Sequence, residues 1–184
     1  MSLHADAEAV LHAFAHLDPA QGTLRGSYLD FLRAHPDAMW RSCRIGHLTA
    51  SALVMDESGT RVLLTLHPRV GRWLQLGGHC EPSDSTLHQA ARREVVEECG
   101  IEPMHMSRQP LRLDRHAVPC GPGGSEHLDV QYLAVVADDA VPVISEESDD
   151  LRWFAVDALP PGADDSVRAL VLDGRRRAAS RRSI

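Results

Sequence analysis

Residues 93–101 read Arg-Glu-Val-Val-Glu-Glu-Cys-Gly-Ile and follow closely on a Gly-Gly pair at 77–78. Glu94, Glu97 and Glu98 stand at i, i+3 and i+4, so a helix would project all three from one face, with neighbouring Cβ atoms about 5–6 Å apart. At an effective dielectric constant near 20, each pair of carboxylates at that separation repels by roughly 3 kcal/mol. Protonation, or a hard divalent cation that prefers oxygen ligands, would relieve this repulsion. A solvated acidic face is the alternative interpretation of the pattern.

The residues around these glutamates resemble the Nudix box, G-x5-E-x7-R-E-U-x-E-E-x-G-U, in which U is apolar. The second half of the box matches at every position from Arg93 to Ile101. In the first half, the acidic position falls on Asp84 when counted from Gly78 and on Ser85 when counted back from Arg93. The segment is therefore one residue longer than the pattern.

We expect the extra residue to be absorbed in the loop at 83–85, because an insertion within the helix would rotate the glutamates by about 100° relative to the helix start. Thr86 and Gln89 have the spacing of a capping box, which favours a helix start after the extra residue. Gly100 suits the end of this helix, and its expected buried stripe consists of Leu87, Ala90, Ala91 and Val95. Asp84 is then expected outside the helix or at its N-cap, where it supports the loop and does not bind metal directly.

The resemblance implies an α/β/α sandwich around a mixed β-sheet. It also implies a Mg²⁺- or Mn²⁺-dependent pyrophosphohydrolase, in which water attacks the phosphorus of a nucleoside diphosphate linked to another moiety. Glu97 and Glu98 are then the first-choice metal ligands and Glu94 is the third. The carbonyl group of Gly77 is added from the family, because a Gly-Gly turn at 77–78 is expected to let the backbone approach the metal closely. Glu94 and Arg93 count as catalytic candidates, and Arg93 is expected to orient a box carboxylate through a salt bridge.

A general base is also required, and many Nudix enzymes place one on a loop before the last core strand. In this chain that loop is 145–150, and the spacing back from Trp153 favours Glu147 over Glu146, as base or additional ligand. A solvated acidic loop is the alternative. Arg72 and Trp73 are candidates for substrate binding, although a tryptophan at this position is more often part of a core.

Two other functions stay open beside hydrolysis. A non-catalytic Nudix-fold nucleotide-binding or sensor domain commonly loses box glutamates, whereas this chain keeps all three. An isomerase of the isopentenyl diphosphate type needs a cysteine and a glutamate near the site, for which Cys80 is a suggestive candidate. A zinc site is a further alternative, and its candidate ligands are His79, Cys80, His116, Cys120 and His127. The spacing of these residues matches no compact ligand pattern.

The apolar patterns divide the chain into an N-terminal helical extension at 1–44, a Nudix domain at 45–172 and an Arg-rich tail at 173–184. The extension contains helical spacing at 4–17, ended by Asp18-Pro19, and at 27–34. It is expected to pack on the domain or to form a homodimer contact, and a substrate lid is the alternative. A last helix is expected from Val167, with Asp173-Gly174 as its break. Strands are predicted at 48–55, 61–67, 72–76, 111–118, 128–136 and 151–156.

Composition narrows the class of protein. The chain of 184 residues has a formal net charge of −7, which argues against non-specific nucleic-acid binding, and its cationic side chains are all arginine. No apolar run approaches the length of a membrane span. The N-terminus lacks a basic secretory region, and the cysteines are widely spaced, so free thiols and a cytoplasmic location are expected. The expected partner is a small nucleotide diphosphate.

Overall fold

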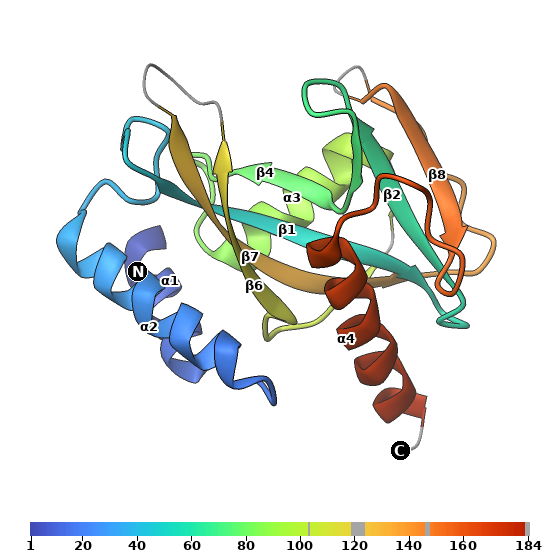
Figure 1. Ribbon diagram of the computed structural model, residues 1–184, viewed down its shortest axis with the longest axis horizontal. Helices are drawn as coiled ribbons and strands as arrows, with labels where there is room; N and C mark the ends of the chain where they lie inside the picture. The colour runs from blue at the N-terminus through green and yellow to red at the C-terminus, as the bar shows by residue number, and fades with distance from the viewer. Residues whose placement is uncertain (103, 119–123, 146–147, 183–184) are drawn as a thin grey trace.

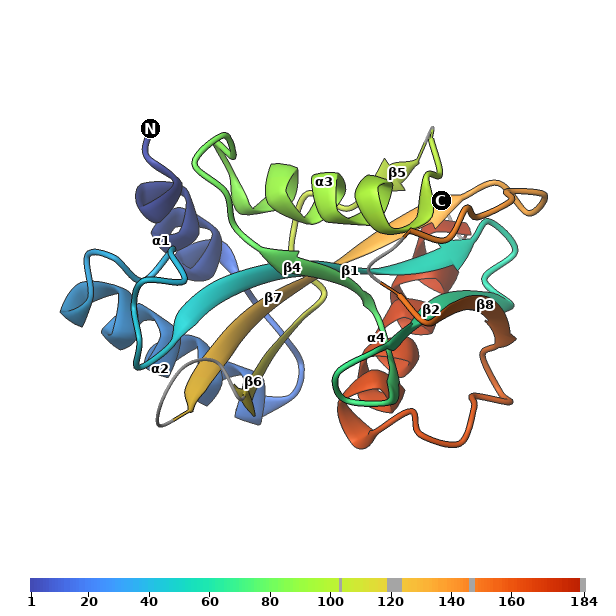
Figure 2. The same ribbon diagram turned by 90° about the horizontal axis from the view of Figure 1, so that it is seen from above.

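In the computed structural model, residues 1–102, 104–118, 124–145 and 148–182 are described. They form a mixed eight-stranded sheet with helices on both of its faces (Figures 1 and 2). The strands are β1 (His47–Asp56), β2 (Arg61–His67), β3 (Arg72–Leu74), β4 (Leu76–His79), β5 (His105–Met106), β6 (Arg112–Val118), β7 (Ser125–Val136) and β8 (Asp150–Ala155). The helices are α1 (Leu3–Ala13), α2 (Pro19–Ala34), α3 (Leu87–Cys99) and α4 (Asp165–Arg182). This arrangement confirms the predicted α/β sandwich.

Two long parallel strands, β1 and β7, form the centre of the sheet and pair along their length from His47 with His127 to Asp56 with Val136. The outer edge of β1 is shared, because β4 pairs with its first half and β2 with its last residues. The outer edge of β7 is shared in the same way by β6 and β5. As a result, β4, β1, β7 and β6 lie side by side at one end of the sheet.

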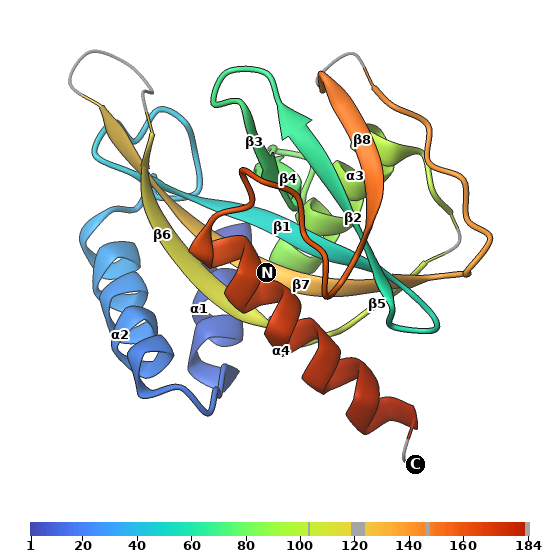
Figure 3. The same cartoon turned by 45° about the vertical axis from the view of Figure 1, so that its right-hand side comes forward.

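Side chains alternate along β1 and contribute to two cores. Leu48 and Val54 face the core shared with α1, α2 and α3, whereas Leu53 and Met55 face the core under α4. Figure 3 shows α4 lying across the sheet on the side away from α3. None of the helices in the described residues is long and apolar enough to cross a membrane.

Both terminal segments differ from the sequence prediction. Asp18-Pro19 begins α2 instead of ending the first helix, since the Asp18 side chain accepts a hydrogen bond from the Ala20 N–H at 2.9 Å and Pro19 occupies the first turn. The first helix ends earlier than expected, at Ala13. Helix α4 continues through Gly174, so the predicted break there is wrong. A Cβ atom on Gly174 would lie 2.6 Å from a Leu53 methyl group, so the glycine permits close packing on the sheet.

The helix α2 covers the free edge of β6 with side chains that replace a neighbouring strand. Gln21 donates to the carbonyl oxygen of Leu113 at 3.0 Å and accepts from the Leu113 N–H at 2.8 Å. The Tyr28 hydroxyl donates to the carbonyl oxygen of Asp114 at 2.6 Å. The two Gln21 bonds satisfy backbone groups that an exposed sheet edge would leave open to pairing with another chain. The Tyr28 hydroxyl also lies 3.2 Å from the carbonyl oxygen of Asp129, so it contacts both β6 and β7.

The N-terminal extension also caps the helix that carries the three glutamates. The buried carboxylate of Asp6 accepts a hydrogen bond from the Leu87 N–H, the first of α3, at 2.8 Å. The first N–H groups of a helix have no partner within the helix, and a negative charge at this end is favourable. The extension therefore stabilises the start of α3.

We expect Asp6→Ala to lower the free energy of unfolding by about 1–3 kcal/mol, because the buried Leu87 N–H loses its acceptor. Chemical denaturation measures this change. Asp6→Asn keeps an acceptor oxygen and should recover part of the loss. Asp30→Ala is the control in the neighbouring helix, since it removes only an exposed pair with Arg33, worth at most about 1 kcal/mol. Equal effects of Asp6→Ala and Asp30→Ala would contradict the capping role.

Candidate active site

The Gly77-Gly78 pair lies within β4, so the expected Gly-Gly turn is wrong. In the strand pairing, Gly77 is opposite Ser51 of β1. A Cβ atom on Gly77 would lie 2.2 Å from the Cβ of Ser51, and one on Gly78 would lie 2.8 Å from a carboxylate oxygen of Glu94. Position 77 therefore needs glycine because β1 approaches it closely, whereas a side chain at position 78 would displace the Glu94 carboxylate.

The three glutamates of α3 differ in exposure and in hydrogen bonding. Glu94 and Glu98 are buried, at 9% and 7% exposure, whereas Glu97 is exposed. The Gly77 N–H donates to Oε1 of Glu98 at 2.8 Å, which ties the helix directly to β4. Burial of a carboxylate is costly unless it is paired or hydrogen-bonded, so these contacts determine where the side chains lie.

Arg93 links the loop before α3 with two of the glutamates. Its guanidinium donates to Oε1 of Glu94 at 3.0 Å, to Oε2 of Glu97 at 2.8 Å and to the His79 carbonyl oxygen at 2.9 Å. It also donates to both oxygens of Asp84, at 3.2 and 2.9 Å. The pKa of Arg93 is raised, first by the hydrogen bonds that it donates to Asp84 and, among the other raising causes, by the neighbouring glutamates. The predicted salt bridge with a box carboxylate is therefore present.

Asp84 lies in the loop, outside α3, as predicted. It is 5% exposed, and its Oδ2 atom accepts from the Glu81 N–H at 2.8 Å as well as from Arg93. With these contacts it holds the loop against the helix. The stretch 87–99, all of it described, is α-helical throughout and contains no π-bulge. The extra residue of the box is thus accommodated before the helix begins.

The ends of α3 follow the predicted local signals. The Thr86 hydroxyl accepts from the Gln89 N–H at 3.0 Å, and the Gln89 side chain accepts from the Ser85 N–H at 3.0 Å. Gly100 ends the helix in the left-handed region, with φ of 65°. The predicted apolar stripe is fully buried; it consists of Leu87, Ala90, Ala91 and Val95.

The donor set at this site suits a hard divalent cation. Asp84, Glu94 and Glu97 bring three carboxylates to a single guanidinium, and Glu98 adds a fourth on the same helix, so negative charge exceeds the charge of Arg93. The donors are all oxygen atoms, which Mg²⁺ and Mn²⁺ prefer. Glu94, Glu97, Glu98 and the Gly77 carbonyl group are the residues that would hold such an ion, and this assignment stays a prediction.

The other predicted site residues have no contact with the α3 carboxylates among the described interactions. Arg72 is exposed and pairs with Asp164 at 3.5 Å. Trp73 is half-buried and makes an edge contact with Phe154, with ring centroids 4.7 Å apart. The loop glutamates at 146–147 lie outside the described residues. Their roles therefore remain predictions from the sequence.

Cys80 does not have the environment of a reactive thiol. It is 6% exposed within the core shared with α3, and burial is the first cause that raises its pKa to about 12. A protonated, buried thiol is a poor nucleophile or proton donor at neutral pH. The structure therefore gives no support to the isomerase alternative that relied on Cys80.

The spacing of residues in the sequence did not reveal a cluster of histidines at β4, the strand that contains Gly77 and Gly78 and is called the glycine strand below. Of the residues considered for a zinc site from the sequence, His79 and His127 lie close together, and His47 lies beside them. His116 contacts the edge of the His127 ring, at 5.5 Å between centroids, while Cys120 lies outside the described residues. The sequence contains one signal for this cluster: two long strands begin near His47 and His127, and these strands pair in parallel with the two histidines opposite each other.

Comparison with known proteins agrees with this fold. A family model described as NUDIX domain matches residues 46–173. The chain is 30% identical over 150 residues to the NAD-capped RNA hydrolase NudC of Stutzerimonas stutzeri, an alignment that covers 76% of this chain and 50% of that protein. The chain therefore spans half the length of this curated relative.

Two solved structures illustrate the shared fold. The Ap4A hydrolase of C. elegans, in a binary complex, superposes with a TM-score of 0.59 at 19% identity, covering 72% of this chain and 98% of that one. The NUDIX domain of Shewanella oneidensis NrtR, complexed with ADP ribose, gives a TM-score of 0.54 at 22% identity, covering 80% and 96%. The fold and the glycine-carboxylate arrangement define a Nudix-type domain. Since the family model matches most of its length, the chain belongs to the Nudix family.

Proposed function

We propose that this Nudix-family chain is a Mg²⁺- or Mn²⁺-dependent pyrophosphohydrolase that cleaves a nucleoside diphosphate linked to another moiety, by attack of water on phosphorus. The observation that carries the proposal is the contact between α3 and β4, where Glu98 accepts from the Gly77 N–H and Glu94 lies against Gly78. A bound divalent cation would offset the negative charge of the diphosphate and stabilise the charge that develops during its cleavage.

Each residue has a proposed part in this reaction. Glu97 and Glu98, with Glu94 as the third ligand and the Gly77 carbonyl group, hold the metal ion. Arg93 fixes the positions of Glu94 and Glu97, which it already contacts at 3.0 and 2.8 Å. Accurate placement of such groups is a large part of catalysis, because there is little covalent chemistry for the protein to perform.

The remaining roles are proposed on sequence position and exposure. Glu147, with Glu146 as second choice, takes the proton of the attacking water, a task for which a carboxylate on a loop is suited. Arg72 is exposed, and its one ion pair among the described residues, with Asp164, is long at 3.5 Å, so it is available to a substrate phosphate. Trp73 offers a ring edge or face to a base.

Removal of divalent metal by excess EDTA should abolish hydrolysis, and Mg²⁺ or Mn²⁺ should restore it, because the carboxylates repel a diphosphate in the absence of a cation. Product formation in both conditions measures the effect. Reaction in ¹⁸O-labelled water should place the label in a phosphate group of one product. A circular dichroism spectrum unchanged by EDTA is the control for folding. Full activity in excess EDTA would contradict the metal-dependent mechanism.

A substrate panel distinguishes the proposed hydrolase from its alternatives. The names of the relatives suggest nicotinamide dinucleotides, free or as RNA caps, together with dinucleoside polyphosphates and ADP-ribose. Nucleotide sugars and oxidised deoxynucleoside triphosphates complete the panel. A sensor domain would bind one of these compounds without turnover, and an isomerase would convert isopentenyl diphosphate. Turnover of a member that joins two groups through a diphosphate is the result expected for the proposed function.

A further inference from the structure

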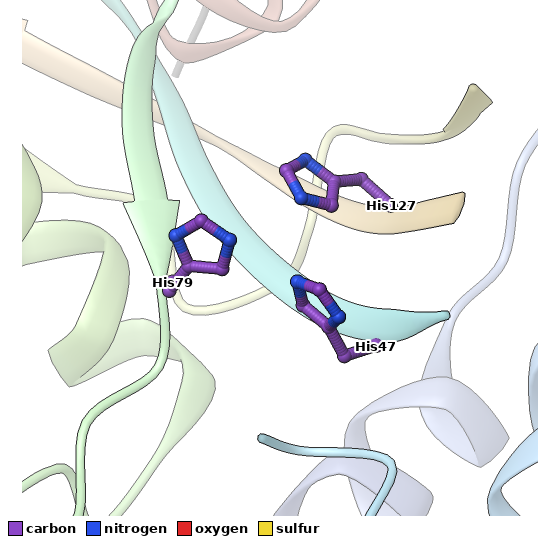
Figure 4. Close-up of side chains that lie close together, drawn as sticks. All are labelled: His47, His79 and His127. Atoms are coloured by element: carbon purple, nitrogen blue, oxygen red, sulfur yellow. The ribbon is translucent and has the colours of Figure 1, made fainter. Parts of the chain in front are cut away.

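Three histidines from three adjacent strands point toward one another at one end of the sheet (Figure 4). His47 begins β1, His127 is its partner on β7, and His79 ends β4 opposite Thr49. The ring centroids are 4.9 to 5.0 Å apart, and one nitrogen from each ring lies within 4.8 Å of the other two. The central strands of the sheet, and not a loop, therefore hold the cluster together.

Two of the three histidines, His47 and His79, have buried ring nitrogens without a hydrogen-bond partner among the described residues. His47 is 2% exposed, yet within the described residues neither of its ring nitrogens has a hydrogen-bond partner of ordinary geometry. The buried Nε2 atom of His79 also lacks a partner there. Leaving a buried polar atom without a partner is unfavourable, because the atom loses its hydrogen bonds to water, so nitrogens in this situation indicate a ligand that would complete the cluster.

We propose that His47, His79 and His127 form a binding site for a divalent transition-metal ion, with Zn²⁺ as the natural probe. Imidazole nitrogen suits zinc, copper and nickel, whereas Mg²⁺ prefers the carboxylate oxygens of α3. Three protein ligands leave a fourth position for water or another small ligand. Zinc–nitrogen distances of about 2.0–2.1 Å require the donor atoms to move closer together, which rotation of the side chains supplies.

The surroundings keep the histidines in the form that binds metal. Burial is the first cause that lowers the pKa of all three rings, so it favours the neutral imidazole, which is the form that binds metal. Arg41 opposes a bound cation, but it is exposed, so solvent and salt screen its charge. His79 and His127 are only partly buried, which leaves a route for the ion.

An occupied site would connect the glycine strand to the centre of the sheet. His79 directly follows Gly78, and its carbonyl oxygen accepts from Arg93 at 2.9 Å. An ion shared by β4, β1 and β7 would hold this strand in place from the side opposite α3. The site is chemically distinct from the carboxylates, because its donors are nitrogen atoms.

Titration of the full chain with Zn²⁺ or Co²⁺, in a large excess of Mg²⁺, tests the proposal. The Mg²⁺ occupies carboxylate sites, so one equivalent of transition metal should bind to the histidines, raise the melting temperature and give a visible Co²⁺ spectrum typical of nitrogen ligands. His79→Asn and His127→Asn should each raise the Kd by at least about tenfold, since even residues that only support metal ligands have effects of that size. These positions are used because replacing the buried His47 endangers folding.

His12→Gln is the matched control, because His12 is exposed on α1 and lies outside the cluster. It should bind the metal as the unsubstituted chain does. Thermal unfolding without metal establishes that each variant is folded. Stoichiometric binding that survives both His79→Asn and His127→Asn, or only weak binding that His12→Gln also reduces, would overturn the site.

Discussion

Glu98→Gln is expected to lower kcat by about 100-fold or more while the protein stays folded. The amide keeps the shape of the side chain and one oxygen, so the hydrogen bond from the Gly77 N–H, 2.8 Å long in the structure, can persist. What is lost is the negative charge of a proposed metal ligand, and changes even to groups behind such ligands cost 10–100-fold. Steady-state kinetics over a range of Mg²⁺ concentrations measures the loss.

The same substitution should leave the free energy of unfolding unchanged or higher, because it relieves repulsion among the carboxylates on α3. Glu102→Gln is the matched control, since Glu102 is exposed just beyond the helix and pairs only with Arg92 among the ion pairs of the described residues. It should retain full activity. A normal kcat in Glu98→Gln would show that Glu98 is not a metal ligand.

The helix that carries the glutamates could be predicted in detail because its signals are local. The capping pair Thr86–Gln89, the apolar stripe and the glycine at its end all lie within fifteen residues of one another. Each acts through contacts inside the helix or its first and last turns. The length and start of α3, and with them the shared face of the glutamates, therefore followed from the sequence.

The course of the chain around the glycines could not be predicted in this way. Gly77 and Gly78 were expected in a turn, but they continue a strand because β1 and Glu94 approach them from elsewhere in the sequence. Similarly, Gly174 lies within α4 because Leu53 lies against it, although glycine alone favours a helix end. In both places a tertiary contact decides between two conformations that the local sequence permits.

The polar face of β1 and β7 depends on contacts that are even more distant in sequence. The fully buried Asp129 accepts hydrogen bonds from the hydroxyl groups of Thr49 and Ser51, at 3.0 and 2.6 Å. His47 and His127 meet through the same parallel pairing. Residues about eighty positions apart become neighbours only when the register of the two strands is known, so the sequence alone could not group them.

Replacing Arg93 is expected to have the largest effect on stability. Arg93→Met should lower the free energy of unfolding by about 3 kcal/mol, the lower end of the range for breaking a buried ion pair by removing one partner. Asp84, whose side chain is 1% exposed, would keep a charge that loses its bidentate partner, and Glu94 would lose a hydrogen bond of 3.0 Å. Arg93→Lys keeps the charge but lacks the planar fork, so it should restore only part of the stability.

A double-mutant cycle separates the ion pair from other effects of Arg93. Adding Asp84→Asn to Arg93→Met removes the stranded charge, so the double variant should be more stable than the sum of the single losses predicts. Arg92→Met is the control on the same helix, because its pair with Glu102 is exposed and is worth at most about 1 kcal/mol. Losses that simply add would mean that Arg93 and Asp84 act independently. The proposed role predicts two results: the stability losses of Arg93→Met and Asp84→Asn are not additive, and Arg93→Lys needs more Mg²⁺ for activity. Together these results would identify the guanidinium as the group that positions Glu94 and Glu97 for the metal.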